Sequence, residues 1–122
     1  MIKILIVEDE KDLLSVLVER FTEEKFSVEV ARDGGEAVPA VNKFMPDIVL
    51  LDLILPKKSG FDVLKELKAD EKTKNIKVVV LSNLAEDENI KKAIKLGADD
   101  YFVKTQHPIT ECVEKVKAIA LR

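Results

Sequence analysis

The sequence contains one cysteine, one histidine and no tryptophan. Because Cys112 has no second cysteine to pair with, an intramolecular disulfide is excluded. With His107 as the only histidine, a zinc site built from histidine and cysteine ligands is excluded as well. We interpret Cys112 as a half-buried thiol of a helix and His107 as a loop residue before the last helix. No apolar run approaches the roughly 20 residues that span a bilayer, so we expect no membrane contact.

The chain also lacks a leader pattern and a large net charge of either sign. Met1-Ile2-Lys3 leads directly into the first apolar run, without the charged segment and longer apolar stretch of a signal peptide. The formal net charge is -3, with acidic and basic residues interspersed, which leaves no basic stripe for nucleic acid. We therefore expect a cytoplasmic protein without direct nucleic-acid contact, and its 122 residues fit a single domain.

Short runs rich in valine, isoleucine and leucine alternate with helical patterns along the chain. Continuous apolar runs of this length are typical of strands that are buried on both faces of a sheet. The predicted strands are Lys3–Val7, Val28–Ala31, Ile48–Leu51, Val78–Leu81 and Tyr101–Val103, of which the second is the least apolar. The alternation predicts an α/β fold: a flavodoxin-like, doubly wound, five-stranded parallel sheet of order 2-1-3-4-5 with helices on both faces.

Cap residues agree with these helices, and one proline does not. Asp33-Gly34-Gly35-Glu36 has the pattern of a capping box, and Ser59 and Asp62 have the same spacing before the next helix. Gly97 stands where a glycine commonly ends a helix. Pro39 lies inside the second helical pattern, where it removes a backbone donor and clashes one turn back. We therefore predict a kink or a late start for that helix.

Polar or charged residues follow four of the apolar runs, each at the carboxyl end of a predicted strand. They are Glu8 and Asp9 after the first run, Asp52 after the third, Ser82 after the fourth and Lys104 after the fifth. Taken singly, each has an ordinary explanation as a turn residue, a common hydroxyl or a surface lysine. Because the carboxyl ends of parallel strands meet at one edge of a sheet, their conjunction predicts a single crevice.

Three acids, a hydroxyl and an ammonium in one crevice suit a divalent cation and a phosphoryl group. Neighbouring carboxylates repel one another unless a cation joins them, and oxygen ligands at a hydrated site suit Mg²⁺. An aspartate can act as a nucleophile and form an aspartyl phosphate. Lys104 and Ser82 would contact the phosphoryl oxygens. The pattern therefore predicts phosphoryl transfer at a Mg²⁺ site.

These residues lie in segments that resemble the receiver domain of bacterial two-component response regulators, in its chemotaxis-response-regulator-like form. The resemblance covers nearly the whole chain, and it implies one receiver domain over residues 1-122. Its most specific parts are Val7-Glu8-Asp9-Glu10, the segment from Asp52 to Gly60 and the segment from Gly97 to Lys104.

The resemblance also implies a role for each residue of the crevice. By this resemblance, Asp52 is the phosphoacceptor. Asp9, Asp52 and the backbone carbonyl of Ile54 are implied to be direct Mg²⁺ ligands, and Glu8 is implied to act on the metal through a bound water. Ser82 and Lys104 are implied to hold the phosphoryl oxygens, and Ser82 and Tyr101 are implied to form the switch. Taken without the resemblance, Tyr101 reads as an edge-strand aromatic with its hydroxyl in water.

The implied function is a signalling switch rather than an enzyme, although the protein would assist its own phosphorylation and slow dephosphorylation. A sensor histidine kinase or a histidine phosphotransfer protein would donate the phosphoryl group. Ser82 would then move inward, Tyr101 would turn into the space, and the surface of the fourth helix, fifth strand and fifth helix would change. A downstream protein target or output domain would read that surface, and phosphorylation-dependent dimerisation is a further expectation.

The sequence departs from the usual receiver pattern around the crevice. Thr105 follows Lys104 where the family usually has proline after a cis bond, and a cis bond before another residue costs about 3–4 kcal/mol. Either the site supports that strain, or the bond is trans and the lysine is aimed differently. Asn83 replaces a smaller residue. Ile54 and Leu84, two positions that influence attack by water, are apolar, which predicts slow loss of the phosphoryl group.

Several other functions fit the sequence poorly, and one remains as an alternative. A hydrolase of the haloacid dehalogenase type needs an acid two residues after its nucleophile, and Ile54 stands there. A flavin carrier needs a phosphate cradle after the first strand, where Glu8-Asp9-Glu10 would repel phosphate. A nucleotide-binding P-loop is absent. The serious alternative is a receiver-like protein-interaction module that is never phosphorylated.

Overall fold

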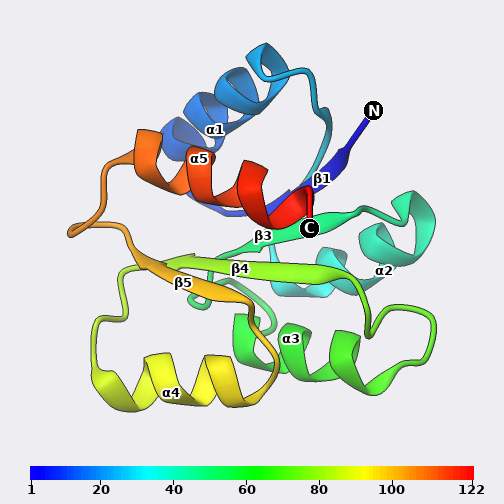
Figure 1. The fold of residues 1–122 in the computed structure, drawn as a ribbon. Helices are drawn as coiled ribbons and strands as arrows, with labels where there is room; N and C mark the ends of the chain where they lie inside the picture. Colours follow the sequence, from blue (N-terminus) through cyan, green and yellow to red (C-terminus); the bar gives the residue numbers. More distant parts are fainter.

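Five parallel strands and five helices alternate along the chain of the computed structural model, which describes residues 1–122 (Figure 1). The strands are β1 (Lys3–Val7), β2 (Ser27–Ala31), β3 (Ile48–Leu51), β4 (Lys77–Ser82) and β5 (Asp100–Val103). The helices are α1 (Lys11–Glu23), α2 (Gly34–Phe44), α3 (Gly60–Ala69), α4 (Asp87–Lys95) and α5 (Ile109–Ala120). The strand order is β2-β1-β3-β4-β5 and every pairing is parallel, which confirms the predicted fold.

Helices cover both faces of the sheet, α1 and α5 on one side and α2, α3 and α4 on the other (Figure 1). Successive residues of a strand point to opposite faces. Leu5 and Val7 therefore join the core under α2, α3 and α4, whereas Ile4 and Ile6 join the core under α1 and α5. All four are buried, because the central strands have helices above and below. This double burial is why their sequences read as continuous apolar runs.

The edge strand β2 is the exception that its sequence predicts. It pairs with β1 alone, and only Ala31 of its five residues is buried. Glu29 and Val30 are exposed. An edge strand covered on one side by few neighbours needs fewer apolar residues, so its pattern is the weakest of the five.

The predicted caps are present, but the prediction of a late start for α2 is wrong. Asp33 accepts a hydrogen bond from the Glu36 N–H at 2.8 Å and opens α2 at Gly34, five residues before Pro39. The helix continues through the proline, because a proline removes a single donor while Ala37 and other buried residues hold the segment against the sheet. The predicted kink remains a prediction.

The remaining caps follow the sequence. Ser59 accepts a hydrogen bond from the Asp62 N–H at 3.3 Å at the start of α3. Gly97 follows α4 with a φ of 112°, a left-handed conformation that glycine adopts without strain. Cys112 lies in α5 as predicted, but it is buried rather than half-buried, and burial raises its pKa to about 12. No helix is long and apolar enough to cross a membrane.

Candidate functional site

The predicted residues lie at the carboxyl ends of β1, β3, β4 and β5, where the acids and Lys104 come together. The Asp52 N–H donates to the Val7 carbonyl at 3.0 Å, which continues the β3–β1 ladder by one residue and sets the aspartate beside the end of β1. The helices after these two strands, α1 and α3, cover opposite faces of the sheet. A crevice opens at such a switch point. It is a pocket of about 180 Å³ lined by Asp9, Glu10, Asp52, Ile54, Asn83 and Lys104.

Three carboxylates stand together in this crevice. One oxygen from each of Glu8, Asp9 and Asp52 lies within 4.8 Å of the others. Glu8 is 2% exposed and Asp52 is 5% exposed, whereas Asp9 faces solvent. Burial raises the pKa of Glu8, against the lowering effect of hydrogen bonds from the Glu10 N–H and from Lys104. Oxygen donors alone, two buried and one open to solvent, fit a hard divalent cation such as Mg²⁺ that keeps part of its water.

Lys104 is the cation that joins the two buried acids. Its Nζ lies 2.9 Å from Asp52 Oδ2 and 2.9 Å from Glu8 Oε1, and its side chain is 10% exposed. Glu10 is more distant, at 3.7 Å. Burial opposes the charge of the ammonium, yet hydrogen bonds to Asp52 and Glu8 outweigh it and raise the pKa of Lys104. The lysine is therefore charged at neutral pH.

Lys104 points into the crevice although no proline follows it. The chain contains no cis peptide bond, so the bond between Lys104 and Thr105 is trans. The ammonium nevertheless reaches Asp52. The alternative of a strained cis bond is therefore wrong, and a trans bond still brings the ammonium to Asp52.

Ser82 and Tyr101 both bind the backbone of Leu84, in the loop between β4 and α4. The buried Ser82 Oγ accepts a hydrogen bond from the Leu84 N–H at 3.3 Å. The Tyr101 hydroxyl donates to the Leu84 carbonyl at 2.6 Å, and burial raises the pKa of Tyr101. Tyr101 is thus buried with its hydroxyl bonded to protein in this structure, and the expectation of a hydroxyl in water is wrong.

Ile54 borders the crevice without closing it. Its N–H donates to Asp52 Oδ1 at 3.3 Å, while the residue is 57% exposed. Neither Ile54 nor the half-buried Leu84 offers a polar side chain that could orient water.

Two contributors to the site have no role in the sequence-based prediction. Glu10 stands in the acidic run, and its N–H donates to Glu8 Oε2 at 2.9 Å. Gly60 begins α3 so close to the acceptor that a Cβ there would lie 2.1 Å from the Asp52 carbonyl oxygen. The acidic run Glu8-Asp9-Glu10 is a signal in the sequence for Glu10. The close approach of Gly60 is visible only in the packing of α3 against β3.

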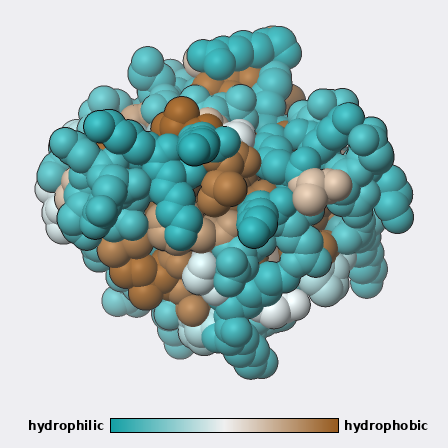
Figure 2. All heavy atoms as spheres, turned by 90° about the horizontal axis from the view of Figure 1, so that it is seen from below, coloured by the Kyte–Doolittle hydropathy of each residue, from teal (hydrophilic) through white to brown (hydrophobic).

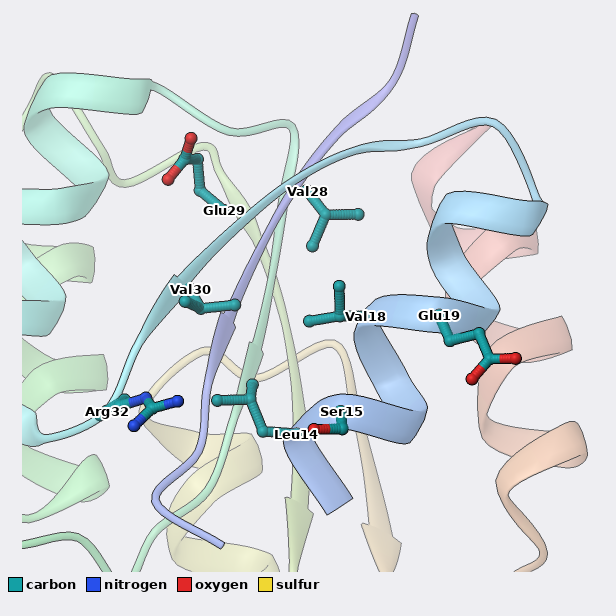
Figure 3. A pocket seen from close by; sticks show the side chains of 8 residues that line it. All are labelled: Leu14, Ser15, Val18, Glu19, Val28, Glu29, Val30 and Arg32. Atoms are coloured by element: carbon teal, nitrogen blue, oxygen red, sulfur yellow. The ribbon is translucent and has the colours of Figure 1, made fainter. Parts of the chain in front are cut away.

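A larger hollow lies elsewhere, between α1 and β2. Figure 3 shows Val18 and Leu14 of α1 facing Val28 and Val30 of β2 across it, with charged residues at its margin. Its volume is about 490 Å³. Its lining combines aliphatic groups with scattered charges, whereas the cluster of three carboxylates lies in the smaller crevice.

Known proteins share both this sequence pattern and this fold. Residues 4–117 match the response regulator receiver domain family. The chain belongs to this family. The phosphate regulon transcriptional regulatory protein PhoB of Escherichia coli is 36% identical over 120 residues, which cover 98% of this chain and 52% of PhoB. The DNA-binding response regulator MtrA of Mycolicibacterium smegmatis is 36% identical over 95% of this chain and 49% of MtrA. The receiver domain therefore spans about half the length of the curated relatives it matches.

Solved structures of receiver domains have the same fold as this chain. The receiver domain of the Francisella response regulator 1452 superposes with a TM-score of 0.92 at 30% identity, covering 100% of this chain and 98% of that one. A BeF3-activated DrrB receiver domain gives 0.88 at 28% identity over 100% and 99% of the two chains. The Mn(2+)-bound form of response regulator Rcp1 gives 0.83 at 28% identity over 98% and 91%. A receiver domain of a response regulator is a phosphorylation-activated switch, and this chain has the receiver architecture.

Proposed function

We propose that residues 1-122 form one receiver domain in which Asp52 accepts a phosphoryl group from a phosphohistidine of a sensor histidine kinase or histidine phosphotransfer protein. The observation that carries the proposal is the ion pair of 2.9 Å between Lys104 Nζ and Asp52 Oδ2 at the base of an open crevice. A carboxylate oxygen of Asp52 attacks phosphorus, and the bond between phosphorus and the histidine nitrogen breaks. The phosphoryl group ends on Asp52 and the histidine is released.

Asp9, Asp52 and the backbone carbonyl of Ile54 would hold Mg²⁺ directly, and Glu8 would contact it through water. A bound divalent cation stabilises negative charge on the transferring phosphoryl oxygens and on the acids around them. The donor set supports this assignment, because three carboxylate oxygens lie within 4.8 Å of one another and one of the acids is open to solvent. Glu8 and Asp52 would otherwise depend on Lys104 alone for positive charge.

Lys104 and Ser82 would hold the phosphoryl oxygens after transfer. The ammonium already touches the acceptor, so a small shift brings it to a phosphoryl oxygen. Ser82 Oγ accepts a hydrogen bond from the Leu84 N–H, and its own hydroxyl proton would be donated to a phosphoryl oxygen. A Ser82 that moves toward the phosphoryl group carries the Leu84 backbone with it.

Leu84 would connect the chemistry to the output surface. Ser82 binds its N–H and Tyr101 binds its carbonyl. A shift of this loop therefore changes the hydrogen bond of Tyr101 and the packing of α4 against β5. The effect is a change in population between two packings, driven by the charge added at Asp52.

The α4-β5-α5 surface would present this change to a partner. Figure 2, which views the molecule from the side of α3 and α4, shows apolar atoms exposed among hydrophilic ones on that side. Of the proposed surface, α4 carries the exposed Ile94. We propose that a downstream protein or an output domain binds here, with phosphorylation-dependent dimerisation as one form of output. The domain would act in the cytoplasm, contact protein rather than nucleic acid, and have no catalytic activity beyond its own phosphorylation and slow dephosphorylation.

Intact mass measurement tests this function directly. Incubation with acetyl phosphate and Mg²⁺ is expected to add one phosphoryl group to the wild-type protein and none to Asp52→Asn. A wild-type protein that stays unmodified with every phosphoryl donor would contradict the proposal and favour the unphosphorylated interaction module.

A further inference from the structure

The amide of Val103 lies on the free edge of the sheet. β5 pairs with β4 only, and the Lys104 N–H donates to the Ser82 carbonyl of β4 at 2.9 Å. Successive N–H groups of a strand point to opposite sides. The Val103 N–H therefore points away from β4, where no strand lies. Val103 is 2% exposed, and a buried N–H without an acceptor is strongly unfavourable.

The His107 ring supplies the missing acceptor. The Val103 N–H donates to His107 Nδ1 at 3.0 Å. Nδ1 also lies 3.3 Å from the Val103 carbonyl oxygen, but that oxygen already accepts from the N–H groups of Gln106 and His107, each at 3.0 Å. We therefore assign Nδ1 as the acceptor, with the ring proton on Nε2. The ring stands edge-on to Phe102, with centroids 5.3 Å apart.

We propose that His107 is a positioning residue for phosphoryl transfer, because its ring closes the turn from Val103 and so aims Lys104 at Asp52. The inference rests on the proposed function of Asp52. Lys104 follows the bonded residue directly, and its backbone has no proline to stiffen it, since Thr105 comes next. Hydrogen bonds fix the backbone just before Lys104 instead: the turn donates to the Val103 carbonyl, and the Val103 N–H donates to the His107 ring.

The rate of phosphorylation by acetyl phosphate in the presence of Mg²⁺, followed by intact mass, measures this role. His107→Ala removes one hydrogen bond and is expected to slow the reaction about 5-fold. His107→Asn, which retains an acceptor on a short side chain, restores most of the rate. Gln106→Ala, a matched change at an exposed position of the same turn, leaves the rate unchanged. In the Lys104→Met background, His107→Ala does not slow the residual reaction further, because there is no ammonium left to aim.

The same set of variants can overturn the proposal. A normal rate in His107→Ala, an equal loss in Gln106→Ala, a failure of His107→Asn to restore the rate, or an equal fold loss in the Lys104→Met background would each do so. If the wild-type protein accepts no phosphoryl group, the proposed function fails, and NMR of the Lys104 side-chain ammonium decides the positioning role separately. Its signal must broaden in His107→Ala but not in Gln106→Ala, and an unchanged signal overturns the role.

Discussion

Replacement of Lys104 by methionine removes the ammonium that contacts both buried acids of the crevice. The Nζ lies 2.9 Å from Glu8 and 2.9 Å from Asp52. Methionine keeps the apolar stem but leaves two neighbouring carboxylates without a positive partner. Removing one member of a buried ion pair costs about 3–5 kcal/mol. We expect about 3 kcal/mol, the lower end of the range, because the pocket opens to solvent and water can reach the acids.

Urea unfolding at neutral pH without divalent cations measures this loss. In a separate thermal unfolding experiment, a loss of about 3 kcal/mol corresponds to a fall of about 10 °C in the unfolding temperature of a domain of this size. Burial already raises the pKa of Glu8 above its usual range in the wild-type protein, and removing Lys104 removes an influence that lowers this pKa. A carboxylate with a raised pKa destabilises the folded state above that pKa. The deficit of Lys104→Met is therefore expected to shrink as the pH falls through the pKa of Glu8, and to shrink on addition of Mg²⁺.

Lys57→Met provides the matched control. Lys57 pairs with Asp33 at 3.5 Å, but its side chain is largely exposed, and such a surface pair contributes little to stability. If Lys104→Met unfolds at the same urea concentration as the wild type, the lysine does not stabilise the acids. If its deficit stays constant from neutral to mildly acidic pH, carboxylate repulsion is not the cause.

Four further results are expected. Gly60→Ala places a Cβ 2.1 Å from the Asp52 carbonyl oxygen and should cost about 2 kcal/mol in urea unfolding, so an unchanged midpoint would refute the close approach. Tyr101→Phe loses the bond of 2.6 Å to Leu84 and should cost about 1 kcal/mol in the same assay. Ile54→Asn or Leu84→Glu should speed loss of the phosphoryl group by positioning water, and equal decay rates in both variants and the wild type would contradict the slow-hydrolysis prediction. Chelation of divalent cations should abolish labelling by acetyl phosphate, whereas labelling that persists would exclude the metal role.

Much of the fold is readable from the sequence because it depends on local patterns. Apolar runs such as Ile48–Leu51 can be buried on both faces only in a central parallel strand, and cap residues such as Asp33 and Ser59 mark where helices begin. Pro39 shows the limit of such rules. Its local effect predicts a late start, but burial of the helix face against the sheet outweighs the loss of one hydrogen bond.

The candidate site divides in the same way. The residue types at the strand ends predict a crevice with Glu8, Asp52 and Lys104 in it, because parallel strands end at one edge. The distances that make these groups interact are not visible in the sequence. They depend on the ladder between β1 and β3 and on the turn after β5.

The sequence by itself determined the order of strands and helices, the caps and the set of charged residues at one edge, since these follow from the periodicity and chemistry of neighbouring residues. Only the tertiary structure decided how Lys104 is aimed without a proline, how closely Gly60 approaches Asp52, and that Ser82 and Tyr101 share the backbone of Leu84. Lys104 and Asp52 lie 52 positions apart in the chain, and Tyr101 and Leu84 lie 17 apart. The geometry of these contacts therefore arises from packing of the whole sheet and its helices rather than from any local pattern.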